Sequence, residues 1–195
     1  MSILFCFLIR AEYNPFPIHN LYRGDTLKKL ISLLLIPFLL LSLSSCSQKD
    51  ASAEELFDVI YFSLSPVPDG ILYLSHSDEG TRHYMSSALF STVYGAIEEN
   101  VIEEYAIYHT FFAIPFEIAV FKCYSPSDAD RVEALCLARL DLLLRHYKGT
   151  SYESAIRSAS IERKGRFVAM LICTERADTD AILHRALNHK SPTIQ

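Results

Sequence analysis

The sequence predicts an α+β fold, in which a largely antiparallel sheet of about four strands packs against helices. Apolar residues recur at helical spacing near position 56 and again after position 125, and at strand spacing within 101–123 and 160–174. The resulting order is helix, helix, strand, strand, helix, strand, strand, helix. This order is typical of helices that cover a single sheet.

The folded part is expected to begin with two helices, over residues 53–62 and 82–94. In the first helix, acidic Glu54 and Glu55 favour a helix start, because carboxylates complement the free amide groups of the first turn. Between the two helices, the stretch SPVPDG at 65–70 is typical of a turn, with Asp-Gly at its tip.

Two strands are expected next, over residues 101–110 and 114–123. Both segments are rich in Ile, Val, Tyr and Phe. In the second, Phe116, Ile118 and Val120 alternate with the intervening side chains, which include Glu117. We expect these two strands to form an antiparallel pair.

The helix that starts at Pro126 has the clearest sequence signals. Ser125 suits the cap, Pro126 suits the first helical position, and Asp128 lies where a carboxylate meets free amides. One face of the helix gathers apolar residues and is expected to pack on the sheet: Ala129, Val132, Cys136, Leu140, Leu143 and Tyr147. A hairpin around Gly165, with strands over 160–164 and 166–174, and a last helix over 176–188 are expected to follow.

The segment before this domain has the pattern of a signal peptide. Lys28 and Lys29 precede an apolar run of about 14 residues, Leu30 to Leu43, within the usual length of such a segment. As a helix this run covers only about 21 Å, whereas the bilayer hydrocarbon is about 30 Å thick. A cleaved signal is therefore expected in preference to a permanent transmembrane helix.

A cysteine follows the apolar run directly. Leu43, Ser44 and Ser45 stand immediately before Cys46, an arrangement that resembles the lipobox of bacterial lipoproteins. The resemblance implies that Cys46 carries a thioether-linked diacylglycerol and becomes the first residue of the mature protein. Two or three acyl chains, such as palmitate, suffice for stable membrane attachment.

The expected organisation has three parts: a signal peptide over 1–45, a lipidated cysteine and tether over 46–52, and one α+β domain over 53–195. The signal starts late, since Lys28 lies 27 positions after Met1. Our hypothesis is that residues 1–26 are not translated and that Leu27 stands where a non-AUG codon encodes the initiator methionine.

Composition excludes several partners. The chain carries a net charge of −5, and residues 47–195 contain 14 basic and 21 acidic residues, a net charge of −7. An acidic domain lacks the basic surface that nucleic acids and anionic lipid headgroups require. The expected membrane contact is therefore made through the lipid, and nucleic acid is not an expected partner.

No motif in the domain indicates a cofactor, a metal or a catalytic residue. Three cysteines, Cys123, Cys136 and Cys173, form no C-x-x-C pair; burial is expected for them, and one disulfide among the three remains an alternative. The histidines show no metal spacing and are expected to be scattered on the surface: His76, His83, His109, His146, His184 and His189.

Two features attract attention. Glu117, inside an apolar strand, is either a functional carboxylate with a raised pKa, a solvent-facing residue, or the partner of Lys122, Arg139 or Arg166. An acidic cluster, Glu98, Glu99, Glu103 and Glu104, adjoins a region rich in tyrosine: Tyr61, Tyr73, Tyr84, Tyr94, Tyr105 and Tyr108. For the acidic cluster, the ordinary interpretation is a solvated face, and the functional alternatives are calcium binding or acid–base chemistry. For the tyrosines, core or rim positions are the ordinary interpretation, and a groove for a peptide or glycan is the functional one.

Several segments together resemble one family. EIAVFKC from Glu117, ARLDLLL near Arg139, Tyr147 and the hairpin GRFVAMLICT are similar to the bacterial lipoproteins grouped as domain of unknown function 4358, over residues 53–187. Such proteins often carry a proline soon after the tyrosine, and this chain has none at 148–151. The resemblance implies a surface lipoprotein of Gram-positive bacteria, with no known activity and no catalytic residue.

The sequence thus favours a non-enzymatic binding or accessory module on the extracytoplasmic face of the membrane, which contacts an envelope protein or a wall component. The alternative is a small envelope hydrolase that uses a carboxylate such as Glu117. A solute-binding lipoprotein is a third option, but its usual two lobes need more than about 149 residues. The first interpretation is preferred because no nucleophile–base pair or metal signature is visible.

Overall fold

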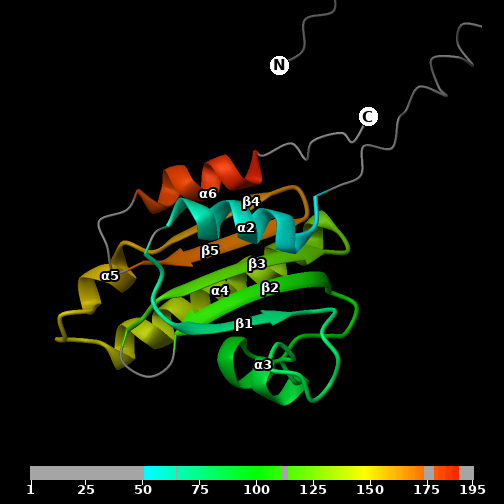
Figure 1. The fold of residues 1–195 in the computed structure, drawn as a ribbon, viewed down its shortest axis with the longest axis horizontal. Helices are drawn as coiled ribbons and strands as arrows, with labels where there is room; N and C mark the ends of the chain where they lie inside the picture. Colours follow the sequence, from blue (N-terminus) through cyan, green and yellow to red (C-terminus); the bar gives the residue numbers. More distant parts are fainter. Residues whose placement is uncertain (1–50, 65, 111–113, 174–177, 189–195) are drawn as a thin grey trace, which may run out of the picture. The chain divides into compact units, whose positions relative to one another are not determined.

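Five antiparallel strands and five helices form the part of the chain that the structure describes (Figure 1). The structure is a computed structural model, and it describes residues 51–64, 66–110, 114–173 and 178–188. The elements, in chain order, are α2 (Ala53–Ser63), β1 (Gly70–Leu74), α3 (Ser87–Tyr94), β2 (Ile102–Thr110), β3 (Glu117–Cys123), α4 (Pro126–His146), α5 (Glu153–Arg157), β4 (Ser160–Lys164), β5 (Phe167–Ile172) and α6 (Thr179–Leu187).

The predicted α+β class is confirmed. The strand order is β1-β2-β3-β5-β4, and each neighbouring pair is antiparallel. The expected pairing of the strands on either side of residues 111–113 is present as β2 with β3. The expected signal peptide, the lipobox with Cys46 and the hypothesis about the start site lie outside the described residues.

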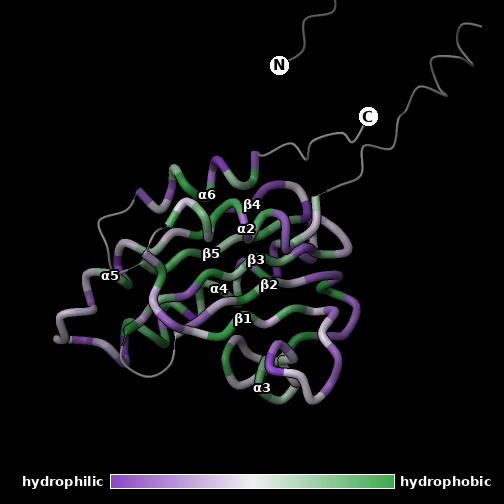
Figure 2. Tube along the Cα trace, viewed as in Figure 1, coloured by the Kyte–Doolittle hydropathy of each residue, from purple (hydrophilic) through white to green (hydrophobic). Residues whose placement is uncertain are grey.

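The sheet is covered on both faces, so the domain has three layers. Helices α2 and α6 pack on one face through one apolar cluster, and α3, α4 and α5 pack on the other face through a second cluster. Strand β3, in the middle, is buried along its whole length, as is nearly all of β5. Figure 2 shows the hydrophobic segments concentrated along these central strands. Both faces of β3 therefore serve as core.

Helix α2 begins with a reciprocal cap. The Ser52 hydroxyl accepts a hydrogen bond from the Glu55 amide at 3.0 Å, and the Glu55 carboxylate accepts one from the Ser52 amide at the same distance. This arrangement satisfies two amide groups that the helix itself cannot bond. Ala53, Leu56, Phe57 and Ile60, which share one face, are buried against the sheet.

Helix α4 follows its sequence signals closely. Ser125 caps it by accepting a hydrogen bond from the Asp128 amide at 3.2 Å, and Pro126 opens it. Of the predicted apolar face, Ala129, Val132 and Cys136 are buried. The later members of that face, Leu140, Leu143 and Tyr147, are only partly buried, because they pack at the border of the second cluster.

Two elements were not predicted. The sheet has five strands instead of about four, because β1 begins at Gly70, where the sequence suggested only a turn. A Cβ at position 70 would lie 2.6 Å from the His109 carbonyl oxygen and 2.8 Å from the Tyr108 ring. Glycine is therefore needed here for the close approach of β1 to β2. The short helix α5 was also missed, and α3 starts at Ser87 instead of near Arg82.

Substitutions along α4 test the burial of its face. Val132→Asp should lower the free energy of unfolding by more than about 3 kcal/mol, because it places an unpaired charge in a fully buried position. Ala138→Asp, at an exposed position of the same helix, should cost less than about 1 kcal/mol. Leu143→Asp should fall between them. Urea unfolding followed by circular dichroism measures all three, and equal losses would mean that the helix is rotated.

Candidate functional site

Glu117 is the most buried carboxylate among the described residues, with 2% of its surface exposed. It opens β3 and points to the same face as Ala119 and Phe121, toward α3 and α4. Its Oε2 accepts two hydrogen bonds from Arg139, from Nε at 3.2 Å and Nη2 at 3.0 Å. Its Oε1 accepts a hydrogen bond from the Tyr94 hydroxyl at 2.5 Å. Both carboxylate oxygens are therefore occupied by partners within the core.

The surroundings of Tyr94 and Arg139 favour the protonated form of both side chains. Burial, and next the charge and hydrogen bond of Glu117, raise the pKa of Tyr94 well above its ordinary value. Burial alone would lower the pKa of Arg139, but the neighbouring Glu117 outweighs it and the pKa is raised. The phenol and the guanidinium thus keep their protons, and each donates to the carboxylate. Of the three cations considered from the sequence, Arg139 is the partner, and Glu117 does not face solvent.

An aromatic cluster extends from this ion pair toward the surface. The ring of Tyr94 lies 5.4 Å from that of Phe121 and 5.2 Å from that of Phe90, measured between centroids. The Phe90 ring in turn lies 5.9 Å from Tyr105 on β2. Since Tyr94 and Phe90 both belong to α3, the bond to Glu117 helps to fix this helix against the sheet.

A second ionic cluster surrounds Lys122, which is only 6% exposed. The register of β2 and β3 shifts between Ile102 and Glu104, so that Glu103 is an extra residue in the strand. As a result two successive carboxylates reach the same ammonium group. Lys122 Nζ lies 3.2 Å from Glu103 and 2.7 Å from Glu104. Glu103 also contacts Arg166, at 2.5 Å.

Glu104 connects this cluster to the start of α2. Its Oε2 accepts a hydrogen bond from the Ala53 amide at 3.0 Å, one of the amides that a helix start leaves without an internal partner. Burial alone would raise the pKa of the Glu104 carboxyl. The hydrogen bonds from Lys122 and Ala53 and the nearby positive charges outweigh this effect and hold the pKa below its ordinary value.

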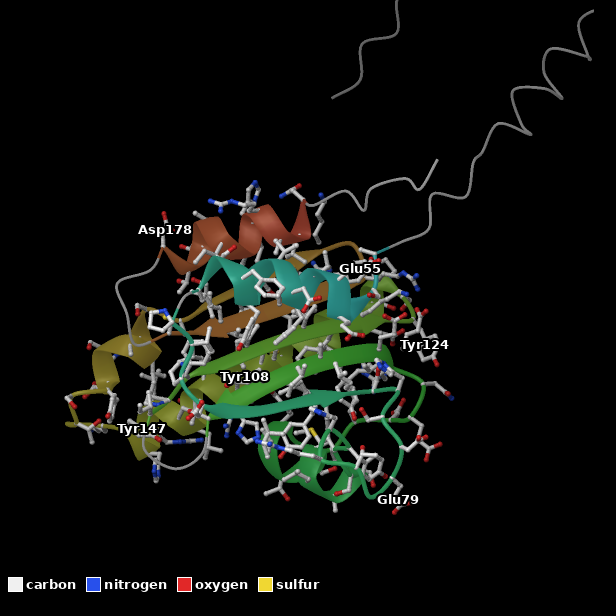
Figure 3. All side chains as sticks on the ribbon, in the orientation of Figure 1. Glu55, Glu79, Tyr108, Tyr124, Tyr147 and Asp178 are labelled. Carbon is white, nitrogen blue, oxygen red and sulfur yellow. The ribbon has the colours of Figure 1, made fainter. Side chains whose placement is uncertain are left out.

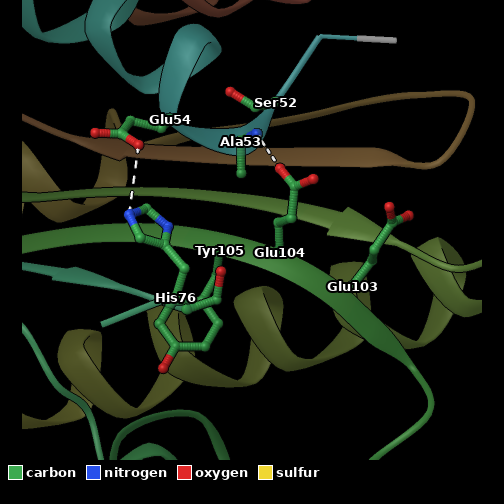
Figure 4. Close-up of a pocket in the computed structure, with 8 residues that line it drawn as sticks. Ser52, Ala53, Glu54, His76, Glu103, Glu104 and Tyr105 are labelled. Carbon is green, nitrogen blue, oxygen red and sulfur yellow. Dashed lines mark hydrogen bonds and ion pairs between the residues drawn. The ribbon is translucent and has the colours of Figure 1, made fainter. Parts of the chain in front are cut away.

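Two adjoining hollows lie beside these clusters. The first, which we call the helix-start hollow, measures about 360 Å³ and lies at the beginning of α2 (Figure 4). Figure 4 shows Glu54 facing His76, whose Nε2 lies 3.8 Å from the carboxylate, and Glu104 reaching the Ala53 amide. Glu103 and Tyr105 complete this side of the hollow.

The second, which we call the aromatic hollow, measures about 380 Å³ and shares Ser75, Glu103 and Tyr105 with the first. It is bordered by α3, the loop before it, the loop after it and the start of β2. Its apolar lining comes from six residues: Tyr84, Met85, Phe90, Ile97, Ile102 and Tyr105. Its acidic lining comes from Glu98, Glu99 and Glu103, and its hydroxyl groups from Ser75, Ser87 and Ser91.

The predicted aromatic and acidic surface is thus partly present. Tyr84 and Tyr105 line the aromatic hollow beside the acidic residues. Tyr94 instead holds Glu117, and Tyr108 donates a hydrogen bond to the Pro68 carbonyl at 2.5 Å. Tyr73 is buried in the second apolar cluster. Phe90, Met85, Ile97 and Ile102 were not among the predicted site residues, because nothing in their local sequence separates a hollow from a core.

A third hollow, of about 430 Å³, lies at the far edge of the sheet between β4 and α6. It includes Glu162 and His184, whose Nδ1 lies 2.8 Å from the carboxylate. Asp178, which caps α6, stands at the start of that helix (Figure 3). Within residues 51–64, 66–110, 114–173 and 178–188, no group of three or more potential metal ligands is present.

The predicted burial of the cysteines is confirmed. Cys123 ends β3, Cys136 lies on the buried face of α4, and Cys173 follows β5. Cys123 and Cys136 are free thiols. Burial raises the pKa of Cys123 to about 11, and it also raises that of Cys136. Such thiols are poor nucleophiles.

Comparison with known proteins adds no relative: no protein-family model, no curated protein and no solved structure matches this chain. In the part of the chain that the structure describes, no helix is long and apolar enough to cross a membrane. The function must therefore be argued from the residues and their geometry.

The first prediction for these clusters concerns the buried ion pair. Arg139→Met should lower the free energy of unfolding by about 3 kcal/mol, because Glu117 stays buried without its cation. Glu117→Met with Arg139→Met should recover most of that loss, since no buried charge remains. Arg145→Met, on the same helix, breaks only an exposed pair with Asp141 and should cost less than about 0.5 kcal/mol. Urea unfolding measures the free energy of unfolding of each variant. Equal losses for Arg139→Met and Arg145→Met would contradict the assignment of Arg139 as the partner of the buried Glu117.

The second prediction concerns pH. The lowered pKa of Glu104 means that its ionised form stabilises the fold above the ordinary carboxyl pKa, about 4.3, and that this contribution is lost as pH falls through the lower folded value. Glu104→Gln should therefore reduce the melting temperature at pH 7, and its difference from wild type should shrink below about pH 4. Glu79→Gln, in an exposed loop, is the control (Figure 3). A constant difference at every pH would contradict the prediction.

Proposed function

We propose that the protein is a lipoprotein anchored through Cys46 to the extracytoplasmic face of the cell membrane, and that its domain is a non-enzymatic binding module of the cell envelope. The lipobox, Leu43 to Cys46, after a lysine-led apolar run supports the anchor. The resemblance to lipoproteins of domain of unknown function 4358 supports the same assignment. An envelope protein or a wall component is the proposed class of partner.

The observation that carries the binding role is the aromatic hollow. Concave sites with an apolar lining and a few polar groups are where proteins bind ligands and partners. Here the partly exposed Tyr84, Ile97 and Tyr105 supply apolar contact area, while three carboxylates stand at the margin. The hollow opens on a domain of net charge −7 over residues 47–195, which disfavours nucleic acid as the occupant.

The hydrolase alternative loses its main support. A catalytic carboxylate needs access to substrate and a free oxygen for proton transfer. Glu117 is buried, both its oxygens accept hydrogen bonds from Tyr94 and Arg139, and it lines none of the three hollows described above. Its geometry is that of a residue that holds α3 and α4 on the sheet.

Two variants of the full chain test the anchor. In Gram-positive cells grown with an alkyne fatty-acid analogue, Cys46→Ala should abolish labelling and leave an unprocessed precursor, because no thiol remains to be acylated. Ser47→Ala, one position along, should be labelled as the wild type is. Undiminished labelling of the Cys46→Ala protein would contradict the proposal.

The same cells test the binding role. A photo-reactive residue at Ser91, which lines the aromatic hollow, should give a discrete adduct with an envelope component. The same residue at exposed Arg185, on α6, should not. The purified protein should not turn over peptide, glycan, ester or phosphate substrates. A turnover that disappears in Glu117→Gln, with the fold intact, would overturn the assignment in favour of the hydrolase.

A further inference from the structure

We infer that the aromatic hollow binds a basic segment of a protein partner, with one lysine or arginine side chain seated along the aromatic lining and its charge at Glu99. The inference rests on the proposed binding function and specifies the ligand class. It is carried by three observations: the apolar lining, the distribution of charge around it, and the rigid support of α3.

The lining suits the stem of a long basic side chain. Lysine and arginine bury their methylene groups on apolar surfaces while their charged ends stay at the margin. Phe90 and Met85 form a nearly fully buried base, and the half-buried Tyr105 stands beside them with its hydroxyl 3.4 Å from the Met85 carbonyl oxygen. Burial, and next the nearby Tyr84, raise the pKa of Tyr105, so that its ring stays neutral. Neutral tyrosine faces also attract a cation.

The charged side chains that line the two hollows are mainly carboxylates. Among the described residues, His76 is the one basic side chain in their lining. The lining also includes five carboxylates: Glu54, Glu98, Glu99, Glu103 and Glu104. Glu103 and Glu104 already contact Lys122, and Glu98 lies 3.3 Å from Arg131. Glu99 is exposed, and among the described residues no cation lies within ion-pair distance of it. A cation from a partner would complete this margin.

The form of the site favours a peptide segment over a single small molecule. The two hollows, about 360 and 380 Å³, adjoin at Ser75, Glu103 and Tyr105, and both are open to solvent. One side chain fills only part of such a surface, whereas a segment of several residues places a cation in the aromatic hollow and extends across the helix-start hollow. Complementary charge also speeds the encounter of an acidic domain with a basic partner.

The lining is held in place before any ligand arrives. Phe90 packs on Tyr94, and Tyr94 donates to the buried Glu117. A site fixed in its bound shape loses less entropy when it binds. Tyr94→Phe removes the hydroxyl that makes this bond and leaves every charge around the hollow unchanged.

The test uses the full chain in detergent micelles and an array of fluorescent heptapeptides. The central residue of each peptide is lysine, arginine, acetyl-lysine or glutamate, and the flanks vary among Ala, Leu, Ser and Tyr. Lysine and arginine peptides should bind, acetyl-lysine should weaken the best binder about tenfold, and added salt should weaken it further. Equal binding of the lysine and acetyl-lysine forms would overturn the inference.

Matched variants locate the binding. Glu99→Gln should weaken the best peptide about fivefold, whereas Glu162→Gln, at the far edge of the sheet, should leave its affinity unchanged. Ser91→Trp should block the hollow, whereas Thr92→Trp, an exposed neighbour on α3 that does not line it, should not. Equal effects within either pair would place the peptide elsewhere and overturn the inference.

Failure of this inference is distinguishable from failure of the proposed function. If no basic peptide binds but the photo-reactive residue at Ser91 still gives its adduct in membranes, the ligand class is wrong and the binding role stands. If neither peptide binding nor an adduct is observed, both proposals fail. If the adduct forms and Glu99→Gln reduces it while Glu162→Gln does not, both are supported.

Discussion

The bidentate bond between Arg139 and Glu117, completed by the Tyr94 hydroxyl, is the interaction on which the arrangement of the domain depends. It joins α4, β3 and α3, which contribute one residue each. A charge buried this deeply destabilises a fold unless each of its oxygens has a partner, so the two helices must take positions that supply them. The pair therefore restricts where α3 and α4 lie more than it adds to net stability. Because Phe90 belongs to α3, its position and that of the aromatic hollow depend on where this bond holds α3.

A second set of charges, around Lys122, lies on the opposite face of the sheet and depends on an irregularity in β2. The extra residue in β2 turns Glu103 and Glu104 toward one ammonium, that of Lys122. Glu104 then uses its other oxygen to bond the first amide of α2. A strand irregularity thus fixes the start of a helix that lies 51 positions earlier in the chain. Glu103 lines both hollows and Glu104 lines the helix-start hollow, so these two carboxylates support the fold and also line the candidate site.

Local signals explain what was predictable from the sequence. The cap, proline and apolar face of α4 all lie within one segment, and the predicted start at Pro126 matches the helix Pro126–His146. Strand β1 has five residues and no clear alternation, and Gly70 looks like a turn residue until the neighbouring Tyr108 and His109 are seen to leave no room for a Cβ. Glu117 was recognised as unusual, but its partners lie 23 and 22 positions away, and only the packing of helices on the sheet selects Arg139 from three candidate cations. The aromatic hollow gathers four separate segments, which no periodicity reveals.

The carboxylates of the domain fall into groups that differ in whether another residue of the chain forms an ion pair with them. Glu117, Glu103 and Glu104 have cations provided by neighbouring elements, and each connects two or more of those elements. Exposed pairs such as Glu98 with Arg131 contribute little, because solvent screens them. Glu99 belongs to neither group: it stands at an apolar hollow, where a cation seated beside it would be partly withdrawn from water and so attracted more strongly than on an open surface. This contrast within one acidic stretch separates the carboxylates that maintain the fold from Glu99, for which we propose a cation from a partner.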